Sequence, residues 1–181
     1  MRGSTETGLF KLFFLIVLFV TGATAANAGR GEISLLAEPK KLPEIVFYDE
    51  ANNSVTLGKW QGKVVLLNIW ATWCPPCVKE MPTFDRLQKR LGGDFFQVVV
   101  LSVDEAGTKA VKKFFGEIKV KNLDIYMDPN FKAAGTLNAL GLPTTILIDL
   151  KGQELGRLVG PAEWDTPEMI SFFKGIIADQ L

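Results

Sequence analysis

The two cysteines of this 181-residue chain are separated by only two residues, in the run Trp73-Cys74-Pro75-Pro76-Cys77. The chain contains no other cysteine. A disulfide across so short a loop connects no distant elements, and stabilisation by a cross-link grows with the length of the loop that it closes. A structural role therefore explains the pair poorly, and we interpret it as a redox-active dithiol.

The Cys-x-x-Cys spacing also occurs in half of a zinc site, which needs two further ligands. This chain has no histidine and no second cysteine pair to complete such a site. The absence of histidine also excludes Ser-His-Asp hydrolysis, Cys-His protease chemistry and histidine-ligated metals. We therefore expect neither a resident metal nor a small cofactor.

The residues on either side predict where the cysteine pair lies in the fold. Residues Val64–Trp70 form a nearly continuous apolar run with several β-branched side chains, which is typical of a buried central strand. After Val78 the apolar residues recur at helical spacing until Gly92-Gly93 ends the pattern. Cys74 would then lie just before a helix, with Pro75-Pro76 in the first turn, where backbone N–H groups have no partner.

A position before a helix favours negative charge on sulfur. The free N–H groups and the dipole of the helix N-terminus stabilise a thiolate. Cys74 is therefore the predicted nucleophile, and Cys77, about one turn into the helix, would resolve the mixed disulfide. Trp73, if exposed beside Cys74, would offer a protein client an aromatic contact surface.

Two blocks of the sequence resemble the TlpA/ResA-like branch of the thioredoxin superfamily. The first runs from Gly62 through the cysteine motif to Pro82, and the second is residues 141–149, GLPTTILID, followed by Lys151-Gly152. The likeness spans residues 42–164. It implies the thioredoxin fold and thiol:disulfide exchange on proteins.

The resemblance assigns roles to the segment around Pro143. The matching proline of the superfamily is cis and packs beside the cysteine pair, which leaves the preceding backbone, here that of Leu142, free to pair with an extended client. The next residue, Thr144, belongs to the expected client-binding segment. The cytochrome-c-maturation members tend to carry an acidic residue there, so Thr144 favours a general TlpA-like role.

Glu80 follows Cys77 by three residues, so on a helix it lies one turn along the same face. Burial near the sulfur pair would raise the pKa of this carboxyl and suit it to proton exchange at neutral pH. The alternative is a solvated glutamate that complements the helix dipole. The resemblance implies a functional glutamate here. Asn68 stands where many thioredoxins have a buried aspartate, and because an amide cannot carry the proton, we assign proton exchange to Glu80.

The N-terminus has the pattern of an export signal. Arg2 and Lys11 flank the start of an apolar stretch at residues 12–20, and small residues lead to Ala26-Asn27-Ala28, an A-x-A cleavage pattern. We interpret residues 1–28 as a signal peptide, or as a membrane anchor if they are retained. The apolar stretch is short for a membrane span, which favours cleavage. The expected location is the periplasm.

Beyond the signal, residues 29–41 lack periodicity and are interpreted as a tether, and residues 42–181 as one thioredoxin-like domain. The order of the elements predicts an α/β fold, a central mixed β-sheet flanked by helices with an added N-terminal β-hairpin. The expected strands are residues 45–48, 54–57, 64–70, 96–102, 124–126, 145–150 and 154–159, and the expected helices after the cysteine helix are residues 108–118, 130–140 and 166–179.

The charge of the chain is balanced, with 20 basic and 20 acidic residues. Removal of residues 1–28 takes away two basic residues and one acidic residue, which leaves a net charge of −1. Such balance gives no general electrostatic attraction to nucleic acid or to anionic membranes. We expect no nucleic-acid partner, and a monomer.

Three functional hypotheses follow. In the first, Cys74 and Cys77 reduce disulfides of exported proteins; the resemblance implies a membrane thiol donor and, as clients, apocytochrome c or copper-site proteins of cytochrome oxidase. In the second, the same pair donates disulfides, because potentials of such folds span roughly −270 to −120 mV. In the third, both sulfurs carry Cu(I), although Met127 and Met169 are remote in sequence from the motif as a third soft ligand.

Overall fold

The structure is a computed structural model that describes residues 31–181. An eight-stranded mixed sheet lies at the centre of this part of the chain. A short 3-10 helix, Leu57–Trp60, follows the third strand. The strands are β1 Ser34–Lys41, β2 Phe47–Asp49, β3 Ser54–Val55, β4 Val64–Trp70, β5 Phe96–Ser102, β6 Tyr126–Met127, β7 Thr144–Ile148 and β8 Gln153–Val159, and the helices are α1 Pro75–Leu91, α2 Thr108–Ile118, α3 Lys132–Thr136 and α4 Pro167–Gln180.

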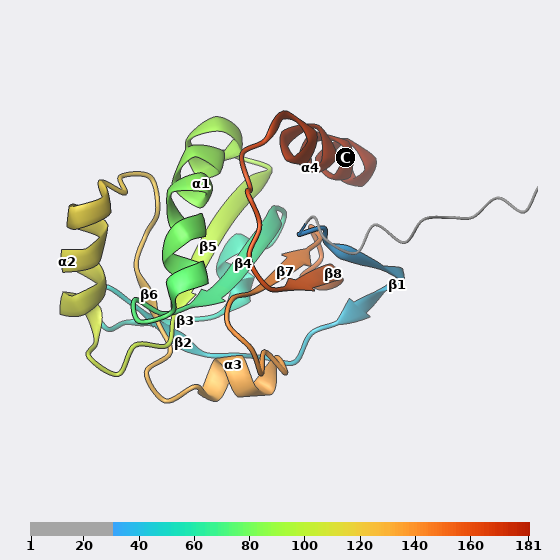
Figure 1. Ribbon diagram of the computed structural model, residues 1–181. Coiled ribbons are helices and arrows are strands. Elements are labelled where there is room, and N and C mark those ends of the chain that lie inside the picture. Colours follow the sequence, from blue (N-terminus) through green and yellow to red (C-terminus); the bar gives the residue numbers. More distant parts are fainter. Residues whose placement is uncertain (1–30) are drawn as a thin grey trace, which may run out of the picture.

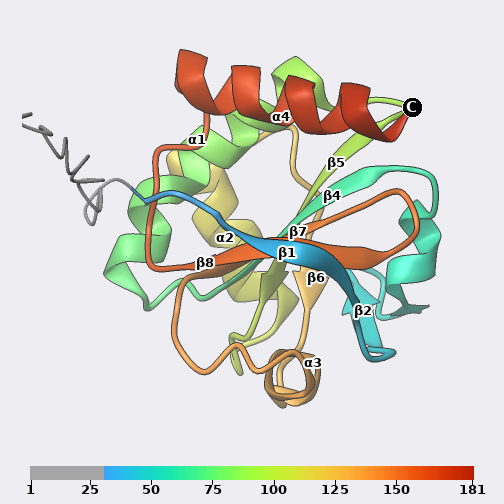
Figure 2. The same ribbon diagram turned by 90° about the vertical axis from the view of Figure 1, so that its right-hand side faces the viewer.

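The strands lie in the order β1-β8-β7-β4-β5-β6-β2-β3. The central strand β4 is parallel to β5 and antiparallel to β7. Helices α1 and α4 lie on one side of the sheet and α3 lies on the other (Figures 1 and 2). This arrangement confirms the predicted α/β thioredoxin fold, in which helices flank a mixed sheet.

The centre of the sheet matches its prediction because the pattern there is strong. All seven residues of β4 are buried, as the apolar run from Val64 to Trp70 indicates. Asn68 is the polar exception within this strand, and it pairs in register with Val100 of β5 and Thr145 of β7. The carboxyl end of β4 therefore delivers the cysteine motif directly to the start of α1.

The N-terminal hairpin is present at one edge of the sheet. Strands β2 and β3 are antiparallel, and Tyr48 of β2 also pairs with Met127 of β6. Phe47 contributes an apolar ring that packs against Trp60 and Tyr126. The added hairpin is thereby confirmed, with both strands shorter than predicted.

The prediction of a tether at residues 29–41 is wrong for most of that range. Residues Ser34–Lys41 form β1, which pairs antiparallel with β8 at the opposite edge of the sheet (Figure 2). Every residue of β1 is exposed, so the strand leaves no alternation of apolar and polar residues that a sequence pattern could detect. Main-chain pairing holds it, and Gly156 of β8 allows the close approach. The predicted export segment, residues 1–28, and residues 29–30 lie outside the described residues.

Helix α3 is shorter than the predicted range 130–140. Phe131 and Asn138 both have positive φ angles, of 54° and 55°, and a right-handed helix cannot continue through such residues. The apolar residues that follow α3 therefore lie in a loop rather than on a helix face. Within residues 31–181, no helix has the length and apolar character needed to cross a bilayer.

Candidate active site

The cysteine pair lies where the sequence places it, at the start of α1. Cys74 is the N-cap residue, and Pro75 begins the helix. Cys74 and Cys77 form a disulfide with an S–S distance of 2.04 Å, and the backbone N–H of Cys77 donates to Cys74 Sγ over 3.4 Å. Cys77 is fully buried, whereas Cys74 retains 5% of its surface. Cys74 is therefore the sulfur that a client can reach.

A buried carboxylate holds the loop that leads to Cys74. Asp104, just after β5, accepts hydrogen bonds from the backbone N–H of Thr72 over 2.9 Å and from Thr72 Oγ1 over 2.6 Å. Ser102 Oγ donates to the same carboxylate over 2.6 Å. Asp104 could not be identified from the sequence, because Thr72 is 32 residues away along the chain and no local pattern marks the contact.

Glu80 is buried on the same helix as Cys77, with 2% of its surface exposed. Its Oε1 accepts from Asn68 Nδ2 over 3.0 Å, and its Oε2 accepts from Trp164 Nε1 over 2.9 Å and from the Ala162 backbone N–H over 3.2 Å. Burial raises the pKa of Glu80 from 4.5 to about 7, and the three hydrogen bonds oppose that rise. The alternative of a solvated glutamate is thus excluded, and the carboxyl can exchange a proton near neutral pH.

Asn68 supports the carboxyl without competing for its proton. The Nδ2 group donates to Glu80 and also to Thr145 Oγ1, each over 3.0 Å, while Oδ1 has no hydrogen-bond partner. An amide has no titratable proton, so this buried position can orient the carboxyl but cannot replace it. Of these two side chains, only Glu80 carries a titratable group.

The Leu142–Pro143 peptide bond is cis, as the resemblance implies. Leu142 and the motif residues line an apolar groove of about 580 Å³ that opens onto Cys74. Trp73 is 62% exposed at this groove and Leu140 is 91% exposed. No charged side chain lines it; the full lining is Trp73, Cys74, Pro75, Pro76, Phe131, Ala134, Gly135, Ala139, Leu140 and Leu142. The structure thereby brings Trp73 and Leu142 into the same groove as Cys74.

Two apolar residues of this groove, Phe131 and Leu140, were missed by the sequence analysis. Both fall within the helix predicted over residues 130–140 and had no role assigned to them, whereas the short α3 leaves both exposed. Asn138 was the available signal, because asparagine tolerates the left-handed conformation that ends a helix.

The assignment of Thr144 to the client surface is wrong for its side chain. Thr144 is fully buried in β7, where it pairs with Ile69 of β4 and Val159 of β8. Its Oγ1 donates to the carbonyl oxygen of Gly141 over 2.6 Å. The residue therefore closes the turn that carries Pro143 instead of touching a client.

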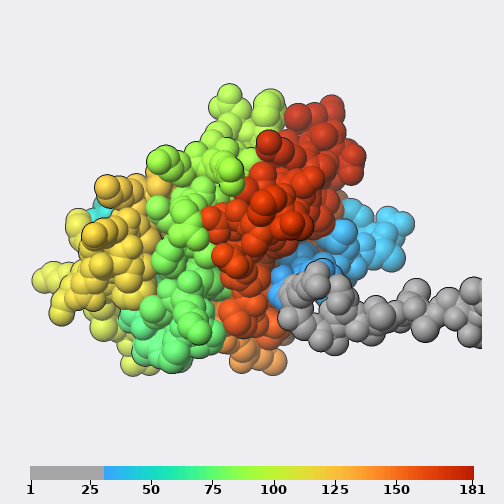
Figure 3. Space-filling model, turned by 45° about the horizontal axis from the view of Figure 1, so that its top comes forward, coloured from blue at the N-terminus to red at the C-terminus, as the bar shows by residue number. Residues whose placement is uncertain are grey.

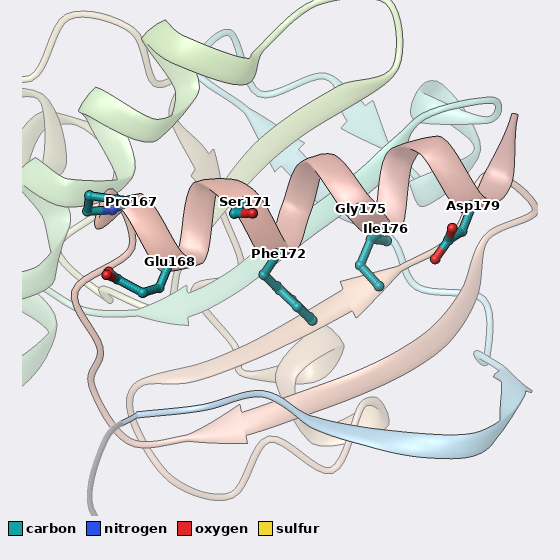
Figure 4. Close-up of a pocket in the computed structure, with 7 residues that line it drawn as sticks. All are labelled: Pro167, Glu168, Ser171, Phe172, Gly175, Ile176 and Asp179. Atoms are coloured by element: carbon teal, nitrogen blue, oxygen red, sulfur yellow. The ribbon is translucent and has the colours of Figure 1, made fainter.

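A second hollow lies along α4 and shares no residue with the cysteine groove (Figure 4). Phe172 and Ile176 point to the same side of the helix, with Glu168 and Asp179 near its two ends. Neither cysteine nor Glu80 reaches this hollow. Among residues 31–181, no group of three or more histidine, cysteine, aspartate or glutamate residues is placed to hold a metal ion.

A thioredoxin fold with a Cys-x-x-Cys disulfide at a helix N-terminus, and a cis-proline that directly follows the groove residue Leu142, defines a thiol:disulfide oxidoreductase. The chain belongs to the redoxin family, whose model matches residues 37–171.

Similar proteins agree with this class. The thiol-disulfide oxidoreductase ResA of Bacillus anthracis is 31% identical over 153 residues, which cover 84% of this chain and 87% of that protein. ResA of Bacillus subtilis (strain 168) is 28% identical over 163 residues, covering 90% and 88%. A solved structure from Chlorobium tepidum, assigned as the thiol:disulfide interchange protein DsbE, aligns with a TM-score of 0.65 at 27% identity and covers 81% of this chain and 99% of that one.

Proposed function

We propose that this protein is an exported reductant of disulfides in other proteins. The observation that carries the proposal is the placement of Cys74 at the mouth of an apolar groove, with Cys77 and the carboxyl of Glu80 buried behind it on one helix. The similarity to ResA oxidoreductases along most of both chains supports the same class of reaction.

The reaction proceeds in two exchanges. The Cys74 thiolate attacks a client disulfide, forms a mixed disulfide and displaces one client thiolate. Cys77 then attacks Cys74 Sγ, which forms the Cys74–Cys77 disulfide and displaces the second client thiolate, so two electrons pass to the client. Glu80 accepts the proton that Cys77 must lose to become a nucleophile, a role that suits a carboxyl whose pKa is about 7.

The groove indicates what kind of client segment can bind. Its lining is apolar and carries no charged side chain, and Trp73 and Leu142 flank the reactive sulfur. An extended segment with apolar residues beside its cysteine fits this surface. Apocytochrome c and copper-site proteins, which the TlpA/ResA-like resemblance implies, are the client classes that we propose.

The proposed location and recycling follow from the N-terminal signal pattern. A reductant in the periplasm needs a source of electrons, because that compartment keeps thiols oxidised. We propose that a membrane thiol donor returns the Cys74–Cys77 disulfide to the dithiol. Fractionation of cells that express the full chain tests the location.

A trapping experiment tests the exchange itself. The reduced Cys77→Ser variant, mixed with a disulfide-containing apocytochrome c haem-attachment peptide, should accumulate a stable mixed disulfide through Cys74, detected by mass. Cys74→Ser is the matched control and should trap none. Equal trapping in the two variants, or none in either, would contradict the proposal.

The two alternative functions, disulfide donation and Cu(I) transport, can each be tested. Disulfide donation uses the same cysteines, and their reduction potential distinguishes it from disulfide reduction. Cu(I) transport requires both sulfurs, so copper titration of the reduced protein against Cys77→Ser decides it. The side chain of Met127 is buried in β6 and lines no part of the cysteine groove, which does not favour it as a third ligand.

A further inference from the structure

The loop between β8 and α4, residues 160–166, lies against α1 (Figures 1 and 3). It is tied to that helix at successive turns. The Ala162 backbone N–H donates to Glu80, the Trp164 backbone N–H donates to Thr83 Oγ1 over 3.2 Å, and Asp165 pairs with Arg86. This loop therefore brings two N–H donors from far along the sequence to the carboxyl that lies one turn from Cys77.

Trp164 is fully buried and makes both aromatic and polar contacts. Its ring stacks on Phe84, with centroids 4.9 Å apart, and lies 6.4 Å from the ring of Phe173. A phenylalanine ring at this position could make part of the same stacking contacts. The feature that only tryptophan supplies here is the indole N–H, which donates to Glu80 Oε2 over 2.9 Å.

The surroundings of Glu80 offer its carboxyl donors only. The polar groups that contact it are the neutral N–H groups of Asn68 from β4 and of Ala162 and Trp164 from the loop. No charged side chain contributes to its shifted pKa. Both oxygens of a carboxylate can accept hydrogen bonds from these N–H groups, whereas a protonated carboxyl has one O–H that acts as a donor. These donors thus offset part of the cost of keeping a negative charge in the core.

We propose that Trp164 is a positioning residue for Glu80: its indole N–H fixes the carboxylate one turn from Cys77 and keeps it able to give up its proton. The consequence for catalysis rests on the proposed function, in which Glu80 serves Cys77. The contact itself does not depend on that function. The two statements can therefore fail separately.

The test compares Trp164→Phe with Phe84→Leu. Both variants weaken the aromatic packing, and only Trp164→Phe removes the indole donor. The protonation of Glu80 is followed by carboxyl-carbon NMR in oxidised protein, and the rate of disulfide reduction is followed against pH. In Trp164→Phe the titration midpoint of Glu80 should rise by about one pH unit, a roughly tenfold change in proton affinity. The acid limb of the rate profile should move to higher pH by the same amount.

The control defines what contradicts the proposal. Phe84→Leu should lower the melting temperature and leave the midpoint of Glu80 in place. An equal shift in both variants, or no shift in Trp164→Phe, would overturn the role of Trp164. A shifted midpoint without any change in the rate profile would keep the contact and reject the proposed use of Glu80 by Cys77.

A second measurement needs no change at Trp164. In the unmodified protein the indole N–H resonance of Trp164 should move with pH at the same midpoint as the carboxyl carbon of Glu80. This response should disappear in Glu80→Gln. An indole resonance that ignores the titration of Glu80 would overturn the proposal even if Trp164→Phe does not fold.

Discussion

Asn68 of β4 and Glu80 of α1 are joined by a buried hydrogen bond, from Nδ2 to Oε1 over 3.0 Å. The bond connects the central strand to the helix that carries the disulfide. Because the amide does not titrate, the pair contains a single titratable group. In the proposed function, Cys77 therefore relies on one carboxyl, whose hydrogen-bond partners are all neutral N–H donors.

The first prediction concerns stability against pH in the oxidised protein. The pKa of Glu80 is about 7 in the folded state and 4.5 is its usual value, so between these limits the folded state binds more protons than the unfolded state. The free energy of unfolding therefore falls as pH rises from about 4.5 to about 7, by on the order of 3 kcal/mol from this group alone. Urea unfolding at several pH values measures it.

Glu80→Gln is the reference for that prediction, because glutamine keeps the shape and does not titrate. The difference in unfolding free energy between the native chain and Glu80→Gln should change with pH in this window and stay constant above it. A difference that is flat across the whole window would show that Glu80 does not hold a raised pKa.

The second prediction concerns Asn68→Asp, which places a second carboxyl beside Glu80. Two buried carboxyls in hydrogen-bond contact disfavour a double negative charge, so the pair should retain a proton to higher pH than Glu80 does alone. The acid limb of the rate profile should move to higher pH by about one unit or more. Thr145→Val is the control, since it removes the other partner of Asn68 without adding charge, and it should leave the limb in place.

The sequence predicts the disulfide site better than its surroundings, for a physical reason. The cysteine pair, its helix and β4 each produce a local sequence pattern, so residue spacing and apolar periodicity are enough to predict them. The partners of Glu80 include Ala162 and Trp164, which are 82 and 84 residues away, and only tertiary packing brings them together. The raised pKa could be expected from burial, but its three donors could not.

The third prediction concerns the apolar groove. Leu140 is 91% exposed, so Leu140→Ser should leave the melting temperature within about 1 °C and should weaken the binding of an apolar client peptide severalfold. Phe95→Ser is the matched control. Phe95 is also exposed, but it lies just before β5, at the end of the sheet away from the cysteine motif. KM for peptide disulfides should rise only in Leu140→Ser, and an equal rise in both variants would reject the groove as the client site.

The fourth prediction concerns β1, whose pairing the sequence did not reveal. A Cβ atom at Gly156 would lie 2.5 Å from the carbonyl oxygen of Ser34, which no real contact allows. Gly156→Ala should therefore separate β1 from β8 and speed hydrogen exchange across residues 34–41. Gly175→Ala in α4 is the control, because it meets no atom within 4 Å and should stabilise by up to about 1 kcal/mol. Unchanged exchange in Gly156→Ala would contradict the close packing of β1.

The edge strand also shows which structural features a sequence pattern leaves undetected. All residues of β1 are exposed, and Pro39 lies where the pairing is interrupted, with a register shift between Leu35 and Lys40. Such a strand is specified by main-chain hydrogen bonds and by the small size of Gly156, neither of which produces hydrophobic alternation. Buried strands carry their own signature; this exposed one does not.

The reduction potential of the Cys74–Cys77 pair decides whether the protein is a reductant of disulfides, as proposed, or a disulfide donor. It is measured by equilibrating the purified protein in defined thiol/disulfide buffers and quantifying the dithiol. A dedicated reductant should give a value near or below roughly −270 mV. A value near roughly −120 mV would contradict the proposed function and would identify the protein as a disulfide donor.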